Sequence, residues 1–139
     1  MESRIEDTIK RHNKGFNCAQ AVACTYCDLL GLEEETVFRM TEGFGAGMGC
    51  MEATCGALSG AVVLAGLKNS DGKLEAPGTK GRTYKLSKEM VRSFQEKCGS
   101  TVCRELKGAG DKKPMHSCEA CIRDAAFIVE NILFGENHA

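Results

Sequence analysis

The sequence lacks the features that would assign it to a membrane or to nucleic acid. Its longest apolar run, Gly56 to Leu67, is well short of the ~20 residues that cross a bilayer. Its formal net charge is −1 and its pI is near 6.3, which leaves no excess of positive charge to attract polyanions. We therefore expect no membrane-spanning segment and no nucleic-acid or membrane partner. Lys107, Lys112 and Lys113 are expected to lie in a solvated loop.

The alternation of apolar and polar residues that marks β-strands is also missing. Apolar residues instead recur at helical spacing almost everywhere, which predicts an all-α protein. The 139 residues are most simply one domain, residues 1–139, forming a helical bundle of about five to six helices. Gly56 to Leu67 predicts the central helix, because its small residues let neighbouring helices approach closely. That helix would pack within the monomer or across a homodimer.

Local patterns predict where several helices begin. Ser3 with Glu6 and Asn17 with Gln20 have the spacing of capping boxes, and Ser117 is a suitable cap for the last helix. The residues expected on the inner faces of the later helices are Tyr84, Leu86, Met90, Val91, Phe94, Ile122, Ala125, Phe127, Ile128, Ile132 and Leu133.

In contrast to these absences, cysteine is abundant. The nine cysteines cannot all pair within one chain, and the first residues are polar and charged where a signal peptide would be apolar. We therefore expect a cytoplasmic protein. Structural disulfides are rare in that compartment, and cysteine clusters there favour metal or redox chemistry.

Four cysteines fall in the first turn of a predicted helix, each one or two residues after a predicted capping residue. These are Cys18 after Asn17, Cys55 after Thr54, Cys103 after the Ser100-Thr101 pair, and Cys118 after Ser117. Free backbone N–H groups and the positive end of the helix dipole favour a thiolate there, and the thiolate is both nucleophile and metal ligand. If successive long helices run antiparallel, the four cysteines reach the same end of the bundle.

The remaining cysteines carry weaker signals. Cys24 and Cys27 favour small core residues, because free cysteine is commonly buried and Cys27 points about 180° away from Cys18 on the same helix. Cys50 and Cys98 would be resolving thiols or core residues.

A further pattern, Cys118-x-x-Cys121 preceded by His116, offers an alternative set of zinc ligands. No second cluster with the spacing of a zinc finger accompanies it.

Glycine alternates with other residues at Gly43, Gly45, Gly47 and Gly49. This spacing matches neither the Rossmann nor the P-loop pattern for phosphate, and no strand precedes it. A loop that brings backbone close to a sulfur or a cluster is the better interpretation. Gly47, Gly49 and Gly56 are therefore the candidate cofactor-binding glycines.

The motifs around these cysteines resemble one known family. They are Asn17-Cys18-Ala19-Gln20-Ala21-Val22, Thr54-Cys55-Gly56-Ala57-Leu58-Ser59-Gly60-Ala61, Cys103-Arg104-Glu105-Leu106, and Cys118 with Ile122-Arg123-Asp124-Ala125-Ala126. They are similar to the family named for its C-GCAxxG-C-C pattern, to which redox activity is ascribed. The resemblance covers nearly the whole chain and implies that the four characteristic cysteines are Cys18, Cys55, Cys103 and Cys118.

The resemblance also implies candidate cofactors. The helical domain of that family is similar to the part of split-Soret cytochromes that is thought to hold an iron–sulfur cluster. Haem is not supported, because Asp28 follows Cys27 and Ile122 follows Cys121, so neither CxxC is a CxxCH attachment site. The cysteines at 24, 27, 50, 98 and 121 depart from the minimal family pattern.

Three functions compete on this evidence. The first is a redox protein in which Cys18, Cys55, Cys103 and Cys118 are catalytic, by thiol–disulfide cycling or by electron transfer with an unidentified redox partner. On the alternative interpretation, the same four cysteines are metal ligands for an iron–sulfur cluster or, less favoured, for zinc. The second function is a small helical binding module without chemistry. The third, an enzyme with Cys55 as its nucleophile, ranks last because no histidine base is evident.

Overall fold

The computed structural model describes residues 1–108 and 115–135, and this part of the chain is helical with no β-strand. The α-helices are α1 (Ile5–Asn13), α2 (Cys18–Tyr26), α3 (Glu34–Thr41), α4 (Gly56–Asn69), α5 (Lys80–Cys98), α6 (Cys103–Lys107) and α7 (Cys118–Leu133). Shorter turns follow α2 (η1, Cys27–Leu30) and α3 (η2, Glu42–Phe44, and η3, Gly47–Met51). The all-α prediction is confirmed, and the described residues form seven α-helices where about five to six were expected. Within these residues no helix has the length and apolarity needed to cross a membrane.

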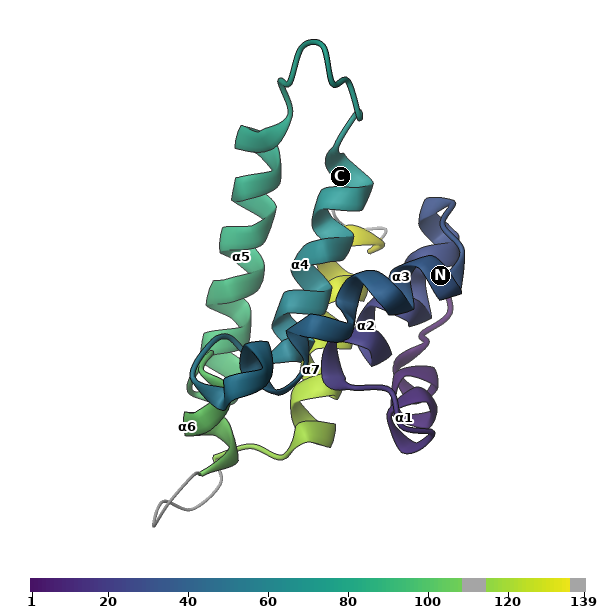
Figure 1. The fold of residues 1–139 in the computed structure, drawn as a ribbon. Coiled ribbons are helices and arrows are strands. Elements are labelled where there is room, and N and C mark those ends of the chain that lie inside the picture. The colour runs from purple at the N-terminus through teal and green to yellow at the C-terminus, as the bar shows by residue number, and fades with distance from the viewer. Residues whose placement is uncertain (109–114, 136–139) are drawn as a thin grey trace.

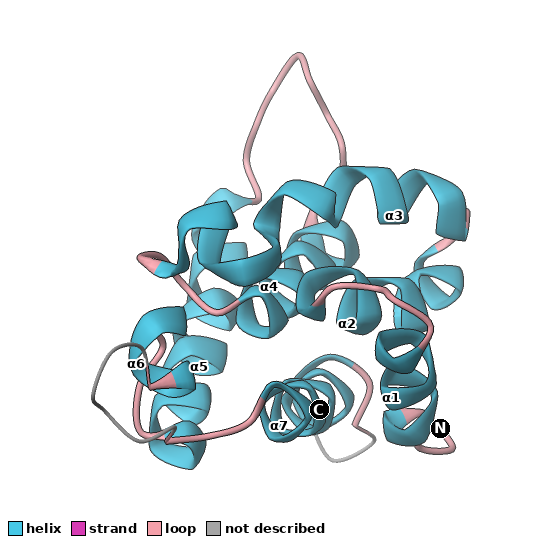
Figure 2. Cartoon of the chain, turned by 60° about the horizontal axis from the view of Figure 1, so that its bottom comes forward, coloured by secondary structure: helices cyan, strands magenta, loops and turns pink. Residues whose placement is uncertain are grey.

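Helix α4 lies at the centre, where it packs against α2, α5 and α7. Figure 1 shows α4 and α5 side by side and joined at one end by the loop of residues 70–79, while α6 lies at the opposite end. From below, α7 lies between α1 on one side and α5 on the other (Figure 2). The beginnings of α2, α4 and α7 are thereby brought to one end of the molecule.

Small residues allow α2 and α4 to touch backbone to backbone. A Cβ atom on Gly60 would lie 2.6 Å from the Ala19 carbonyl oxygen and 3.1 Å from the Ala19 Cα. A Cβ on Gly56 would lie 3.2 Å from the Ala19 backbone nitrogen. The predicted role of this helix is confirmed, and its small face packs within the chain.

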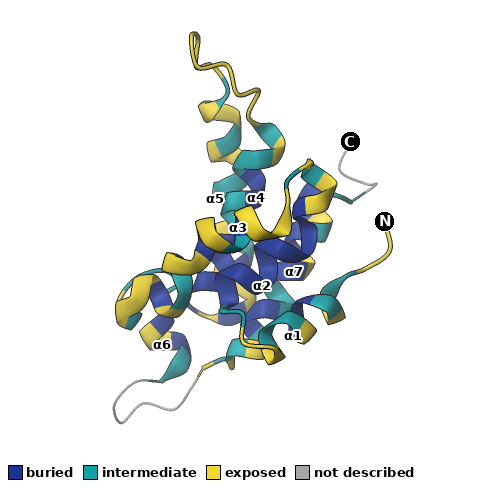
Figure 3. Cartoon of the chain, turned by 45° about the vertical axis from the view of Figure 1, so that its right-hand side comes forward, coloured by how far each residue is buried: buried dark blue, intermediate teal, exposed yellow. Residues whose placement is uncertain are grey.

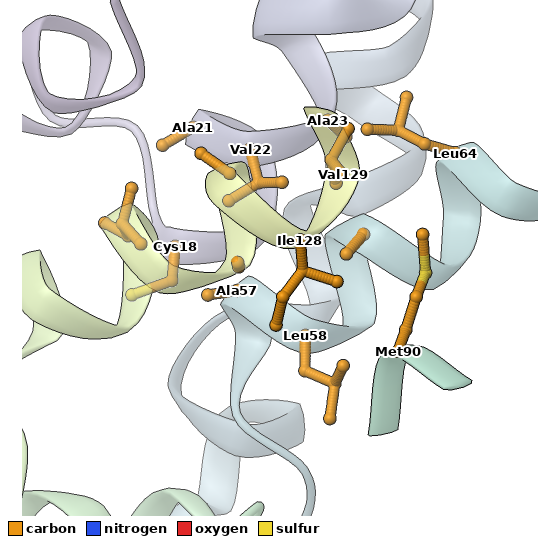
Figure 4. Close-up of a cluster of buried hydrophobic side chains, with 14 of the residues drawn as sticks. Cys18, Ala21, Val22, Ala23, Ala57, Leu58, Leu64, Met90, Ile128 and Val129 are labelled. Carbon is orange, nitrogen blue, oxygen red and sulfur yellow. The ribbon is translucent and has the colours of Figure 1, made fainter. Parts of the chain in front are cut away.

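The core is formed mainly by α2, α4 and α7, which are the most continuously buried helices in Figure 3. Leu58 and Leu64 of α4 belong to the same buried cluster as Ile128 and Val129 of α7 (Figure 4). All four are buried, and each contributes about 1.5–3 kcal/mol of hydrophobic stabilisation.

The predicted inner faces of α5 and α7 are only partly correct. Met90 and Phe94 are fully buried, whereas Tyr84 and Val91 of α5 are 65 % and 40 % exposed and Phe127 of α7 is 47 % exposed. The apolar stripe of α5 is narrower than the sequence indicates. The first half of the helix, which carries Tyr84, extends beyond the rest of the bundle beside α4 (Figure 1).

One of the two predicted capping boxes is present. The Gln20 backbone N–H donates to the Asn17 side chain at 2.9 Å, and the Asn17 N–H donates to the Gln20 side chain at 2.9 Å. The Ser3–Glu6 box is wrong, because Glu6 instead pairs with Arg123 of α7. Tertiary contacts with α7 have replaced the local cap.

Candidate thiol site

Five cysteines line one small cavity. Cys18, Cys55, Cys103, Cys118 and Cys121 surround it, together with Ala46, Gly56, Leu106, Lys107 and His116. Its volume, about 10 Å³, is on the order of the space that one water molecule needs. The structure therefore brings together all four cysteines that the helix-start pattern selected, and it adds Cys121.

Two of these cysteines occupy the first position of long helices. Cys18 begins α2 after the Asn17 capping box, and Cys118 begins α7 after Ser117. The Ser117 hydroxyl accepts a hydrogen bond from the Ala120 N–H at 3.0 Å, so the predicted cap is confirmed.

Cys55 and Cys103 are held together by a short backbone bridge. Thr54 and Val102 form an isolated antiparallel bridge, in which the Cys55 N–H donates to the Thr101 carbonyl at 2.8 Å and the Cys103 N–H donates to the Ala53 carbonyl at 3.0 Å. The bridge ties the segment that carries Cys55 to the segment that carries Cys103 where α4 and α6 begin.

This bridge also changes the predicted caps. Cys55 itself, and not Thr54, is the N-cap residue of α4, and Val102 is the N-cap of α6 in place of Ser100 or Thr101. The Ser100 hydroxyl nevertheless accepts from the Val102 N–H at 3.0 Å.

Two of the three candidate glycines pack against the sulfur-bearing residues. A Cβ on Gly47 would lie 2.5 Å from the Cys103 Cβ and 3.4 Å from its Sγ, and a Cβ on Gly56 would lie 3.4 Å from the Cys18 Cβ. Gly49 has nothing within 4 Å of the equivalent position. Gly47 and Gly56 thus give clearance around the thiols, whereas Gly49 does not contact them.

The loop that covers this side of the cavity is strained. Ala46, Met48 and Met51 have φ values of 53°, 66° and 64°, in the left-handed region that non-glycine residues rarely adopt. Each such residue costs roughly 1–3 kcal/mol when it is held there, and such strain often clusters at functional sites. Ala46 lines the cavity directly.

Most of these thiols are hard to ionise. Hydrogen bonding to Cys118 and burial raise the pKa of Cys18, and hydrogen bonding to Cys121 and burial raise that of Cys55. Burial also raises the pKa of Cys103. The expectation that helix starts favour thiolates is therefore wrong for these three residues. The N–H groups of Ala57 and Leu58 lower the pKa of Cys55, but burial and the neighbouring thiol outweigh them.

Cys118 behaves differently. The Cys18 thiol acts as its hydrogen-bond donor and Lys107 adds positive charge, which together outweigh partial burial and lower the pKa of Cys118 to about 5. His12 contributes in the same direction. Cys118 is also the only one of the four family cysteines that is not buried. It is thus the thiol best placed to react.

Lys107 is a site residue that the sequence did not reveal. It lines the cavity, so its predicted place in a solvated loop is wrong, while Lys112 and Lys113 lie outside the described residues. Burial opposes its charge, but the thiols of Cys118, Cys103 and Cys18 outweigh this and raise the pKa of Lys107. Nothing in its local sequence distinguishes it from a surface lysine.

The comparison with known families gives an independent assignment. Residues 16–132 match the family model described as "Putative redox-active protein (C_GCAxxG_C_C)". The chain belongs to the C_GCAxxG_C_C family. Neither the curated proteins nor the solved structures with which the chain was compared contain a match.

The cysteines beyond the family pattern separate into three groups. Cys24 and Cys27 are buried in the core away from the cavity, in agreement with the sequence, and burial raises the pKa of Cys24 to about 12. Cys50 is exposed in the strained loop. Cys98 and Cys121 extend the thiol site, because Cys121 hydrogen-bonds with both Cys55 and Cys98.

The distances between possible ligand atoms distinguish two kinds of metal site. Two ligands bound to one zinc ion at ~2.3 Å lie at most about 4.6 Å apart. In residues 1–108 and 115–135, the one group of three donors within 4.8 Å of one another is Cys98, His116 and Asp124. No three of the cavity's sulfurs meet that limit, so the four family cysteines do not form a ready site for a single ion. The Nε2 atom of His116 hydrogen-bonds with Asp124. It therefore does not join Cys118 and Cys121 in the zinc site that the sequence offered as an alternative.

Proposed function

We propose that the protein is a redox protein that exchanges thiols and disulfides, with Cys118 as the attacking thiolate and Cys18 as the resolving thiol. One observation carries the proposal. Cys118 is partly exposed, has a lowered pKa, and lines the same cavity as Cys18, its hydrogen-bond donor. A low-pKa, accessible cysteine beside a second cysteine is the arrangement that redox-sensing and exchanging proteins use.

The chemistry balances with a disulfide as oxidant. The Cys118 thiolate attacks one sulfur of a partner's disulfide, and the other sulfur leaves as a thiolate. Cys18 then attacks the Cys118 sulfur of this mixed disulfide and gives its proton to the departing partner sulfur. The product is a Cys18–Cys118 disulfide and a partner reduced by two electrons. The charge of Lys107 stabilises the anionic sulfur before the attack.

Cys55 and Cys103 complete the proposed four-cysteine site. Both line the cavity, and Cys55 hydrogen-bonds with Cys121. We propose that these buried thiols receive the disulfide from the Cys18–Cys118 pair by the same exchange. The disulfide would then join buried cysteines that solvent does not reach. The partner is a cytoplasmic redox protein or small molecule that carries a disulfide and reaches only Cys118 of the four.

Alkylation mapped by mass spectrometry tests this proposal. At pH 7 the reduced protein should be labelled first at Cys118, and treatment with a small disulfide should link the Cys18 and Cys118 peptides. Cys18→Ser should retain a mixed disulfide at Cys118, and Cys118→Ser should form neither product. Cys24→Ser, a buried thiol away from the cavity, is the matched control and should behave as wild type. Equal labelling of all cavity thiols, without a Cys18–Cys118 disulfide, would refute the proposal.

An iron–sulfur cluster is the second candidate, favoured by the number of sulfurs around one cavity. Cys18, Cys55, Cys103 and Cys118 are a chemically suitable donor set, because Cys₄ ligation holds [2Fe–2S] and [4Fe–4S] clusters. Their separation suits ligands to different irons better than ligands to one ion. Such a cluster would supply one-electron transfer.

Iron and sulfide analysis of protein purified without oxygen separates the two candidates. Stoichiometric iron with sulfur-to-iron absorption bands that vanish in Cys55→Ser would favour the cluster. Iron-free protein that forms the Cys18–Cys118 disulfide would favour exchange.

A further inference from the structure

We propose that Cys98, His116 and Asp124 form a second site, next to the cavity of the four family cysteines but with ligands of its own, that binds a divalent transition metal of the zinc type. Three segments supply the ligands: Cys98 ends α5, His116 precedes α7, and Asp124 lies in the second turn of α7. Their ligand atoms all lie within 4.8 Å of one another.

The distances suit one ion. The Cys98 Sγ lies 3.5 Å from the Asp124 Oδ2, and the His116 Nε2 lies 2.7 Å from the same oxygen. Two ligands held at ~2.1 Å in a tetrahedron are about 3.4 Å apart. The imidazole therefore has to move by less than about 1 Å to exchange its hydrogen bond for a metal bond, and the sulfur needs almost no movement.

The chemistry of the donors selects the metal. Thiolate and imidazole are borderline-to-soft ligands that suit zinc and its neighbours in the first transition row, whereas calcium and magnesium prefer oxygen. Metal binding releases one proton from the Cys98 thiol. Asp124 binds as the carboxylate and His116 as the neutral imidazole. Three protein ligands leave the fourth position to water.

The charge of the site also favours a cation. Among the described residues, His116 is the only basic side chain within ion-pair distance of Asp124, and no lysine or arginine there pairs with this carboxylate. The Asp124 side chain is nevertheless only 29 % exposed. A divalent ion would supply the missing charge in a partly buried position, where electrostatic attraction is stronger than in water.

The backbone around His116 is already organised for this role. The Met115 and His116 N–H groups both donate to the Leu106 carbonyl, at 2.9 Å and 3.1 Å. These bonds hold the segment before α7 against the end of α6. A ligand that is fixed by its backbone loses less conformational entropy when the metal binds.

Cobalt(II), which reports on its ligands by absorption, tests the proposal in anaerobic, reduced, metal-free protein. Wild type should bind one Co²⁺ with tetrahedral d–d bands and a thiolate-to-cobalt band that Zn²⁺ displaces. Asp124→Asn and His116→Gln should weaken binding at least tenfold, and Cys98→Ser should remove the thiolate band. Cys24→Ser is the control for loss of a buried thiol.

The same titration distinguishes this site from the proposed exchange site. Cys118→Ser should abolish disulfide formation and leave the cobalt spectrum unchanged. A spectrum lost in Cys118→Ser but insensitive to Asp124→Asn and His116→Gln would place the metal among the family cysteines and overturn the proposal. Failure of wild type to bind Co²⁺ would also overturn it. Circular dichroism checks folding, and Asp124→Asn keeps the shape of the side chain if another variant does not fold.

Discussion

The contact between α2 and α4 can be tested with one methyl group. In Gly60→Ala, the new Cβ would lie 2.6 Å from the Ala19 carbonyl oxygen, a separation that real Cβ atoms do not adopt. The obstacle is backbone, so a rotamer change cannot remove it and one helix has to shift. Overpacking of this kind costs roughly 1–3 kcal/mol.

Gly66→Ala is the matched control on the same helix. A Cβ at Gly66 meets nothing within 4 Å. Replacing a mid-helix glycine by alanine in open space stabilises a protein by about 0.5–1 kcal/mol, because a glycine loses more conformational entropy on folding than an alanine does. The same intrinsic gain applies at Gly60, where the clash opposes it.

The two variants should therefore differ clearly in stability. Because the intrinsic gain is common to both, we expect the free energy of unfolding of Gly66→Ala to exceed that of Gly60→Ala by about 1–3 kcal/mol, measured by urea denaturation followed by circular dichroism. Gly60→Ala should also slow formation of the Cys18–Cys118 disulfide, because α2 carries Cys18. A Gly60→Ala protein as stable as Gly66→Ala would refute the close contact and the packing that it explains.

Three further predictions concern reactivity and stability. Because the pKa of Cys118 is lowered to about 5, its alkylation rate should already be nearly constant above pH 6, and Lys107→Met should move the rise in rate to higher pH; stopped-flow alkylation measures both. Phe94→Ala should destabilise the protein by about 3–5 kcal/mol in thermal unfolding, whereas Phe127→Ala, at an exposed ring, should change stability by less than about 1 kcal/mol. Glu130→Ala should cost about 1.5–3 kcal/mol in the same assay, because it removes the carboxylate oxygen that accepts hydrogen bonds from the buried Tyr26 hydroxyl at 2.5 Å and the Arg4 N–H at 2.7 Å.

The sequence predicted the fold where a local signal and a tertiary contact agree. Asn17 and Gln20 form the expected capping box, and Gly60 allows the expected close approach of α4. The prediction was wrong where they conflict. Glu6 could complete a local cap, but a bidentate pair with Arg123 satisfies it instead. Apolar spacing also cannot tell which part of α5 extends past its neighbours, so Tyr84 was assigned to the core.

The sequence identified the members of the thiol site better than their chemistry. Helix-start position selected four cysteines that do line one cavity, because chain reversals bring the starts of α2, α4 and α7 to the same end. The pKa values of these cysteines depend on burial and on neighbours distant in sequence. Lys107 and Cys18 act on Cys118 from other helices, and no local pattern encodes such a meeting. Asp124 was missed for the same reason.

Helix α7 links the two proposed sites. Cys118, Cys121 and Asp124 are spaced by three residues, and at about 100° per residue each step turns about 60° around the helix. Cys121 therefore lies between the reactive thiol and the carboxylate, and it hydrogen-bonds with Cys55 of the cavity and with Cys98 of the second site. A metal on Cys98, His116 and Asp124 would fix the rotation of α7 and hence the position of Cys118. Bound zinc should therefore reduce the number of conformations in which Cys118 reacts. Its alkylation should then follow a narrower distribution of rate constants, and Cys118 should still be the first cysteine to react.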